Sequence, residues 1–339
     1  MKASVIYLLL IFLTACNNIS HATFETPKLE GGATDMKLIQ TMPLQGVEGR
    51  IDHLSIDIKG QRLFVAALGN NTVEVIDLNT GKVVHSISDL SEPQSALFVP
   101  SLNKIFVTNG GNGICQIFDG TSFAELGRVQ ISGDADNIRY DSNSTSVIVG
   151  YGDGGLSFID GSSAKEVSNV KLDGHPESFQ FESSGARIFV NIPSSNQIAV
   201  VDRKQGKVVS TWLMTSALAN FPMAFDETQH RLFVGFRVPA KLIVFNTETG
   251  KPVTGFDSVG DVDDIFYDAA HKLIFVIGGE GYIELFSQRD ADHYQSLGRI
   301  STADGARTGL WVVESNRLYI AVPHKGKQEA EIQVYELQP

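Results

Sequence analysis

Charged and polar side chains of differing chemistry precede each copy of an internal repeat in this 339-residue sequence. Each copy has an apolar anchor in its second predicted strand. The residues eleven positions before the anchors are His53, Ser95, Asn137, Ser178, Pro222, Asp264 and Thr308. One position earlier stand Asp52, Gln94, Asp136, Glu177, Phe221, Asp263 and Arg307, and a little further ahead lie Arg50, Glu92, Asp134, His175 and Asp261. Because each copy presents a different group, we predict a site for an asymmetric small ligand.

The side chains of this predicted site combine carboxylates, imidazoles, amides and guanidiniums. Carboxylate oxygens and imidazole nitrogens are common ligands of divalent metals, whereas a guanidinium can hold a carboxylate or phosphate with two hydrogen bonds. The ligand-binding candidates are Arg50, Asp52, His53, Glu92, Asp136, Asn137, His175, Glu177, Asn220, Asp263, Asp264 and Arg307. The metal-ligand candidates are His53, Asp136, His175, Glu177 and Asp264. A divalent metal is the one cofactor that these residues suggest, although no spacing along the chain tests whether they meet.

A purely structural interpretation of these residues stays open. Asp and Asn at strand starts cap turns, and the mouth of a channel is wet, so polar residues are expected there without a function. A turn aspartate would recur in every copy, and one nearly does so just after the first strand of each copy: Asp57, Asp141, Asp226 and Asp268. The residues ahead of that strand do not recur in this way, which favours a binding site.

The elements that position these residues follow from the repeat. Its anchors, 41 to 44 residues apart, are Phe64, Phe106, Ile148, Phe189, Phe233, Phe275 and Tyr319. Short alternating runs rich in Val, Ile and Phe, bounded by Gly, Asn and Asp, predict strands. Seven such copies predict an all-β, seven-bladed β-propeller of four-stranded antiparallel blades over residues 36–339. The last copy ends after its third strand, so the strand near residue 36 is expected to complete that blade and close the ring.

The phrase RLFVAALGNNTVEVIDLNTGKVV at residues 62–84 resembles the YVTN repeat of YncE-like seven-bladed propellers. The resemblance extends from Met36 to Leu337 and implies a propeller fold of the broad WD40-like kind. It implies no catalytic motif, because the same fold serves lactonases, reductases and scaffolds. Aromatic and large apolar residues at matching positions of the first strands, such as Phe98 and Trp311, are predicted to pack between blades.

The N-terminus has the pattern of a secreted lipoprotein. Lys2 precedes an apolar run that is too short to span a membrane, and the run ends in Leu13-Thr14-Ala15-Cys16, which resembles a bacterial lipobox. We expect residues 1–15 to be a signal peptide, Cys16 to be lipidated, and residues 16–35 to be a flexible tether. Asn17, rather than Asp, after the cysteine favours the periplasmic face of the outer membrane. The alternative is an ordinary signal peptide with an unrelated cysteine.

The overall charge limits the partners. The formal net charge is −12, and it becomes −13 if the signal peptide with Lys2 is removed. Such a surface repels phosphate backbones, so we expect no nucleic-acid binding, and we expect membrane contact only through the lipid. If Cys16 carries lipid, Cys115 has no disulfide partner and is predicted to be a small buried residue.

Sequence motifs of known chemistry are not found. The run GYGDGG at residues 150–155 matches a dinucleotide-binding pattern, but a strand rather than a helix follows it, so we interpret it as a hairpin. The leading hypothesis is a monomeric periplasmic module that binds a small polar ligand or a protein partner. The alternative is a metal-assisted hydrolase resembling propeller lactonases, with Arg307 stabilising an oxyanion. Whether the protein is an enzyme is left open.

Overall fold

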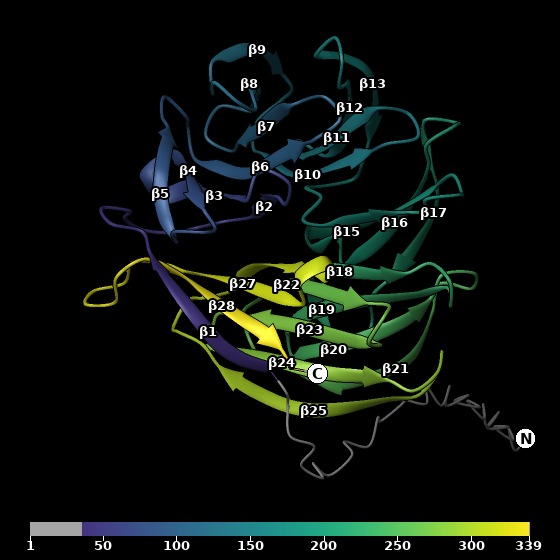
Figure 1. Cartoon of the computed structure of the whole chain (residues 1–339). Helices are drawn as coiled ribbons and strands as arrows, with labels where there is room; N and C mark the ends of the chain where they lie inside the picture. Colours follow the sequence, from purple (N-terminus) through teal and green to yellow (C-terminus); the bar gives the residue numbers. More distant parts are fainter. Residues whose placement is uncertain (1–35, 339) are drawn as a thin grey trace, which may run out of the picture.

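The chain forms a seven-bladed β-propeller, which the computed structural model describes over residues 36–338. Seven four-stranded antiparallel sheets are arranged in a ring (Figure 1). The predicted signal peptide, Cys16 and the tether lie outside the described residues. Within the described part of the chain, no helix is long and apolar enough to cross a membrane.

Each blade runs from an inner strand at the channel to an outer strand at the periphery. Blades 1 and 2 contain β2 (Leu54–Asp57), β3 (Arg62–Ala67), β4 (Thr72–Asp77), β5 (Lys82–Ile87), β6 (Pro93–Val99), β7 (Lys104–Asn109), β8 (Ile114–Asp119) and β9 (Glu125–Gln130). Blades 3 and 4 contain β10 (Ala135–Asp141), β11 (Ser146–Tyr151), β12 (Gly155–Asp160), β13 (Lys165–Lys171), β14 (Phe179–Phe181), β15 (Arg187–Ile192), β16 (Gln197–Asp202) and β17 (Lys207–Leu213). Blades 5 and 6 contain β18 (Leu218–Asp226), β19 (Arg231–Val238), β20 (Ala240–Asn246), β21 (Lys251–Asp257), β22 (Val262–Asp268), β23 (Leu273–Gly278), β24 (Tyr282–Gln288) and β25 (Tyr294–Ser301).

Blade 7 closes the ring. It contains β26 (Thr308–Val312), β27 (Arg317–Val322), β28 (Glu331–Leu337) and, as its outer strand, β1 (Met36–Pro43). β1 pairs antiparallel with β28, from Met36 opposite Leu337 to Pro43 opposite Glu331, and the two strands lie side by side in Figure 1. The predicted closure by the N-terminal strand is therefore correct. Main-chain hydrogen bonds between β1 and β28 join the first and last described strands, so the ring has no gap between its first and last blades. Three short 3-10 helices, η1 (Leu68–Asn70), η2 (Pro193–Ser195) and η3 (Val313–Ser315), complete the described elements.

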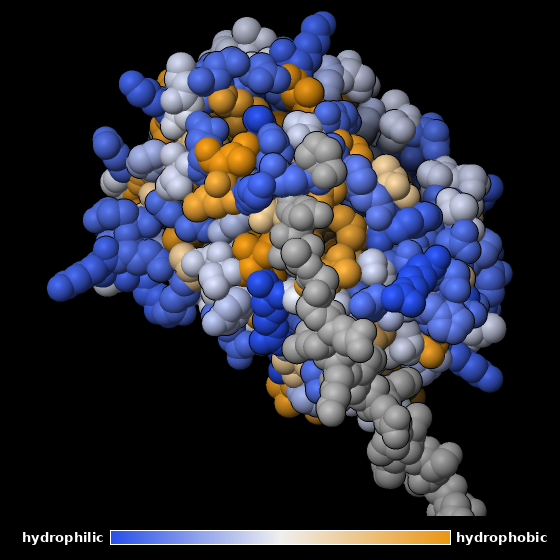
Figure 2. Space-filling model, turned by 60° about the horizontal axis from the view of Figure 1, so that its bottom comes forward, coloured by the Kyte–Doolittle hydropathy of each residue, from blue (hydrophilic) through white to orange (hydrophobic). Residues whose placement is uncertain are grey.

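The strands within a blade differ in burial. In β3 every residue from Leu63 to Ala67 is fully buried, because neighbouring blades cover both faces of the sheet. In the outer strand β5 all residues but Ile87 are exposed. Polar and charged side chains accordingly cover much of the face shown in Figure 2, with apolar side chains gathered near its middle.

Aromatic side chains connect successive blades at the expected positions. Phe64 of blade 1 stacks on Phe98 of blade 2 with ring centroids 5.5 Å apart, and Phe275 of blade 6 stacks on Trp311 of blade 7 at 4.5 Å. These contacts add to the burial of apolar surface and fix the spacing of the blades. Cys115 is fully buried in the core, and burial raises the pKa of its thiol to about 12, so it is a packing residue.

The recurrent aspartates after the inner strands hold turns. Asp57 accepts hydrogen bonds from the Gly60 backbone N–H at 2.8 Å and from Arg62 at 2.6 Å. Asp268 likewise accepts from the Ala270 N–H at 2.9 Å. The GYGDGG run is a hairpin loop between β11 and β12, as interpreted from the sequence. These features belong to the scaffold, and they leave the irregular residues ahead of the inner strands to define a site.

Candidate functional site

A polar cavity of about 330 Å³ opens at one mouth of the central channel. All seven blades contribute to it, and we call it the funnel. Its lining residues are Arg50, Leu68, Glu92, Gln94, Asp134, Asp136, His175, Glu177, Phe221, Arg237, Asp263 and Arg307. Its volume lies within the range of small-ligand sites. The residues that directly precede or open the inner strands therefore meet in space, although they are spread over some 260 residues of chain.

Irregular pairing at the start of the inner strands directs several of these side chains. The register of β10 against β11 shifts between Ala135 and Ile138, a segment that contains Asp136. The register of β22 against β23 shifts between Val262 and Asp264, on either side of Asp263. Similar shifts occur in β6 around Gln94 and in β18 around Phe221. A β-bulge releases a residue from the ladder and re-aims its side chain, which explains how these residues reach the funnel.

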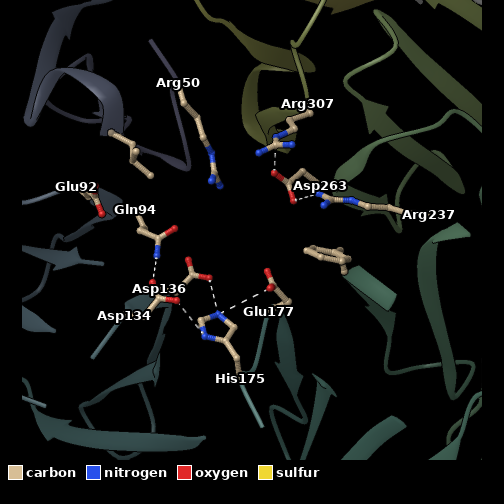
Figure 3. A pocket seen from close by; sticks show the side chains of 12 residues that line it. Arg50, Glu92, Gln94, Asp134, Asp136, His175, Glu177, Arg237, Asp263 and Arg307 are labelled. Carbon is tan, nitrogen blue, oxygen red and sulfur yellow. Dashed lines mark hydrogen bonds and ion pairs between the residues drawn. The ribbon is translucent and has the colours of Figure 1, made fainter. Parts of the chain in front are cut away.

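One side of the funnel, which we call the arginine side, carries three guanidiniums (Figure 3). Asp263 lies between two of them, with Arg237 Nη2 at 2.7 Å from its Oδ1 and Arg307 Nε at 2.9 Å from its Oδ2. Arg307 also contacts Asp261 at 3.0 Å. Arg50 pairs with the buried Asp52 at 2.7 Å. Each arginine is thus held by a carboxylate.

The opposite side, which we call the histidine side, is organised around His175 (Figure 3). His175 Nε2 lies 3.3 Å from Asp136 Oδ2 and 3.9 Å from Glu177 Oε1. The other ring nitrogen, Nδ1, lies 3.3 Å from Asp134 Oδ2. Gln94 donates a hydrogen bond of 2.5 Å to the second oxygen of Asp134. One imidazole therefore faces three carboxylates.

Burial perturbs the acids of the funnel. It raises the pKa of Glu177 to about 7, with the charge of Asp136 adding to the effect. Burial also raises the pKa of Asp134 and of Asp263, in the latter case against the opposing influence of Arg307 and Arg237. For His175, burial alone would lower the pKa, but the hydrogen bond and charge of Asp136 outweigh it and the pKa rises. Acids and a base with shifted pKa values in one cavity are typical of functional sites.

Below the funnel the channel narrows to a neck formed by Asp52, His53 and Asn137. His53 Nδ1 lies 3.5 Å from Asp264 Oδ2, and its Nε2 lies 3.1 Å from Asn137 Nδ2. Burial by itself lowers the pKa of His53, but Asp264 and Asp52 outweigh burial and raise it to about 10. Burial raises the pKa of Asp52, although His53 and Arg50 oppose this. In the neck, His53 therefore contacts Asp52, Asn137 and Asp264 and carries a positive charge between two carboxylates.

A second chamber of about 360 Å³ lies on the other side of the neck. Its lining mixes apolar side chains, such as Leu54 and Met223, with polar ones, such as Arg139, Ser178 and Gln180. Burial lowers the pKa of Arg139. The charged residues predicted from the sequence are therefore concentrated in the funnel and the neck.

Most of the ligand-binding candidates named from the sequence meet in the funnel or its neck, with two exceptions. Asp264 lines the lower chamber and pairs with His53. Asn220 lines none of the three cavities, since its fully buried amide donates to Asn191 Oδ1 at 2.9 Å and to the Gln197 carbonyl at 3.0 Å. The adjacent bulge instead places Phe221 at the funnel. Asn220 is therefore a packing residue of blade 5 rather than a lining residue.

The five metal-ligand candidates separate into two groups. Asp136, His175 and Glu177 can each offer a ligand atom such that all three atoms lie within 4.8 Å of one another. His53 of the neck instead pairs with Asp264, which lines the lower chamber. The structure thus brings together three of the five.

Sequence reasoning missed one cation of the funnel. Arg237 stands near the end of β19, which has eight residues where the corresponding strands of the other blades have six. Its guanidinium lies over the ring of Phe221, 3.6 Å from the ring centroid, and it donates to the Val262 carbonyl at 2.9 Å. The additional length of this strand in the sequence, ending in Phe236-Arg237-Val238, is the signal that could have identified it.

The sequence matches no protein-family model and no curated protein. Similarity is found among solved structures. A chain of the mitotic checkpoint complex aligns over 100% of both chains with a TM-score of 0.74 and 14% identity. A chain of hydrazine synthase from Kuenenia stuttgartiensis covers 82% of this chain and 95% of its own length, with a TM-score of 0.71 and 14% identity. At this identity the likeness supports the β-propeller fold alone, a scaffold that hosts many functions.

Proposed function

We propose that this protein is a binding module whose funnel holds a small polar ligand with an anionic group. The observation that carries the proposal is the arginine side, where Arg50, Arg237 and Arg307 line one cavity with fixed orientations. Paired guanidiniums keep several N–H donors free, because a guanidinium has five and each carboxylate uses one or two. Such donors suit a carboxylate or phosphate of the ligand.

Other parts of the funnel would set specificity. The ring of Phe221 supports the Arg237 guanidinium and limits its motion, which lowers the entropy lost when a ligand binds. The carboxylates across the cavity, including Glu92 and Glu177, can accept hydrogen bonds from hydroxyl or amino groups of the same ligand. A ligand with an anionic end and a hydroxylated or amino end fits both sides.

The predicted cellular setting forms part of the proposal. The Leu13-Thr14-Ala15-Cys16 pattern supports a lipid anchor at Cys16, and Asn17 favours the periplasmic face of the outer membrane. The YVTN-type phrase supports kinship with YncE-like propellers. Labelling of cells with a radioactive fatty acid tests the anchor: the wild-type protein incorporates label and Cys16→Ser does not. A wild-type protein without label would rule the anchor out.

The binding proposal is tested by calorimetry and thermal melting of purified protein with succinate, citrate and glycerol phosphate as probes. We expect at least one probe to bind, and Arg307→Gln to weaken that binding at least 10-fold. The matched control is Lys325→Gln, which removes an exposed cation on the loop before β28 that pairs with Asp304 outside the funnel. Equal binding by Arg307→Gln and wild type, or no binding of any probe, would overturn the proposal and favour a protein partner.

A metal-assisted hydrolase is a second candidate, favoured by the position of the arginine side directly across the cavity from the His175 group. A cation held there could polarise a carbonyl while Arg307 stabilises the developing oxyanion. Hydrolysis of a lactone and of a nitrophenyl ester with Zn²⁺ or Mn²⁺ present is the test. Turnover by wild type that is lost in Arg307→Gln supports this candidate. If wild type turns over none of the substrates, the hydrolase candidate is rejected and the binding proposal stands.

A further inference from the structure

We propose that Asp136, His175 and Glu177 form a binding site for a divalent first-row transition-metal ion. Asp134, itself hydrogen-bonded by Gln94, orients the His175 ring for this site. This site uses the histidine side of the funnel, whereas the proposed anion grip uses the arginine side. The metal site can therefore be tested without knowledge of the ligand. It also stands if the anion-binding proposal fails.

The positions of the three ligand atoms fit a metal. Zinc binds imidazole nitrogen and carboxylate oxygen at about 2.0 to 2.2 Å, so ligands around a tetrahedral ion lie roughly 3.3 to 3.6 Å apart. His175 Nε2 is 3.3 Å from Asp136 Oδ2 and 3.9 Å from Glu177 Oε1. The three atoms lie within 4.8 Å of one another, so small rotations of the Glu177 side chain would complete the geometry. All three side chains line the funnel (Figure 3), so water or a ligand in the funnel could complete the coordination of an ion held by them.

The surroundings of His175 orient it as a metal ligand. Its Nδ1 lies 3.3 Å from Asp134 Oδ2, so Nδ1–H donates to this carboxylate. Nε2, which hydrogen-bonds Asp136 without an ion, offers its lone pair once a metal ion displaces the Nε2 proton. Asp134 is itself held by the 2.5 Å hydrogen bond from Gln94. Metal-binding histidines usually have such a carboxylate partner on the second nitrogen, and the partner fixes the tautomer and ring orientation.

The charge of the group provides independent support. Asp136 is 6% exposed, and the only hydrogen-bond partner of its carboxylate among the described residues is His175. In the described part of the chain, no lysine or arginine nitrogen lies within 4.0 Å of a carboxylate oxygen of Asp134, Asp136 or Glu177; the ion pairs of these three acids are to His175 alone. Buried carboxylates are normally paired or bound to a cation. A divalent ion would neutralise this group where the chain does not.

The mixture of donors selects the class of metal. Calcium and magnesium prefer sites made entirely of oxygen ligands, whereas an imidazole together with carboxylates suits zinc, manganese or ferrous iron. None of the described residues that line the funnel is a cysteine, which disfavours ions that require thiolate ligands. We therefore choose Zn²⁺ and Mn²⁺ as probes.

The test is metal binding by the purified protein after removal of metals with a chelator, measured by calorimetry and, for Mn²⁺, by electron paramagnetic resonance. We expect one equivalent of Zn²⁺ or Mn²⁺ to bind. Asp136→Asn and His175→Gln should each weaken binding at least 100-fold. Asp134→Asn should weaken it 10- to 100-fold while one equivalent still binds at saturation, because it acts only through His175.

The matched control is Glu92→Gln, which removes another funnel carboxylate that lies outside the three-residue group. Its metal affinity should stay within about 2-fold of the wild-type affinity. The circular dichroism spectra of all variants should match that of wild type. If a variant unfolds, the resonance spectrum of Mn²⁺ on the wild-type protein still reports whether nitrogen is a ligand. No binding of either ion by wild type, binding that persists in His175→Gln, or equal losses in Glu92→Gln would overturn the proposal.

Discussion

The two sides of the funnel have similar positions in the fold and opposite electrostatic situations. On the arginine side, three guanidiniums meet three carboxylates, Asp52, Asp261 and Asp263, at contacts of 2.7 to 3.0 Å. On the histidine side, three carboxylates share one imidazole at 3.3 to 3.9 Å. The arginine side is therefore neutralised by the chain itself, and the histidine side is not.

This difference indicates how each side would work. A self-neutralised network is rigid and keeps donors in place for a ligand without a large cost of desolvation at the moment of binding. Three carboxylates that share one imidazole repel one another until a further positive charge binds, so the group favours binding of a cation. Variants that remove a charged group, together with metal loading of the histidine side, test this comparison.

The largest effect is expected for Asp263→Ala on the arginine side. It leaves Arg237 and Arg307 without their shared carboxylate, whose side chain is only 11% exposed. Removal of one partner from a buried ion pair typically costs about 3 to 5 kcal/mol of unfolding free energy. Urea denaturation of metal-free protein measures this. A loss of less than about 1 kcal/mol would show that the arginine side is not an integrated network.

Metal loading should stabilise the protein through the histidine side. At a free ion concentration of 100 times the dissociation constant, a bound ion adds about 2.7 kcal/mol to the free energy of unfolding. Zn²⁺ should therefore raise the melting temperature of wild type, and a chelator should reverse the rise. The same rise in His175→Gln would place the ion elsewhere.

The neck should give a pH-dependent contribution through His53. Asp264 and Asp52 raise the pKa of His53 to about 10, above its unfolded value of 6.5. The negative charge of Asp136 raises this pKa further. The stabilisation by the imidazolium is therefore fully present below pH 6.5 and is lost as the pH rises through 10. Since about a fifth of the imidazole side chain is in contact with solvent, we expect a change of about 2 kcal/mol.

The measurement for His53 is the stability of wild type minus that of His53→Gln, from urea denaturation between pH 6 and pH 10 in chelator. This difference should decrease with rising pH. A difference that is constant over the range would mean that His53 is neutral in the folded protein.

The smallest effect is expected for Asp136→Asn in metal-free protein. It removes one charge from a group in which like charges repel, so stability should be unchanged or should rise by about 1 kcal/mol. The opposite signs of Asp136→Asn and Asp263→Ala would sharpen the contrast between the two sides. A loss of more than about 2 kcal/mol in Asp136→Asn would show that the histidine side is already neutralised.

Patterns along the sequence were sufficient to predict the seven-bladed ring. Strand periodicity and turn residues such as Asp57 act over a few residues, and the 41- to 44-residue spacing of the anchors gives the number of blades. Ring closure followed because the last copy lacked one strand. The same alignment of the copies identified Arg50, Asp136, His175 and Arg307 as residues of one mouth, because they interrupt the pattern.

Only the tertiary structure decided which of these residues meet. Whether His53 joins His175 or Asp264 depends on where blades 1, 4 and 6 lie around the channel, and the bulges in β10, β18 and β22 decide which side chain of each segment points inward. The bulge in β18 leaves Asn220 in the core and places Phe221 at the funnel, whereas Arg237 reaches the funnel because β19 is longer than the corresponding strands. The sequence by itself determined the ring and most of the residues at its mouth, since both follow from the repeated pattern along the chain. The division of the charges into a neutralised and an unneutralised side depends on distances across the channel, which exist only once all seven blades are packed.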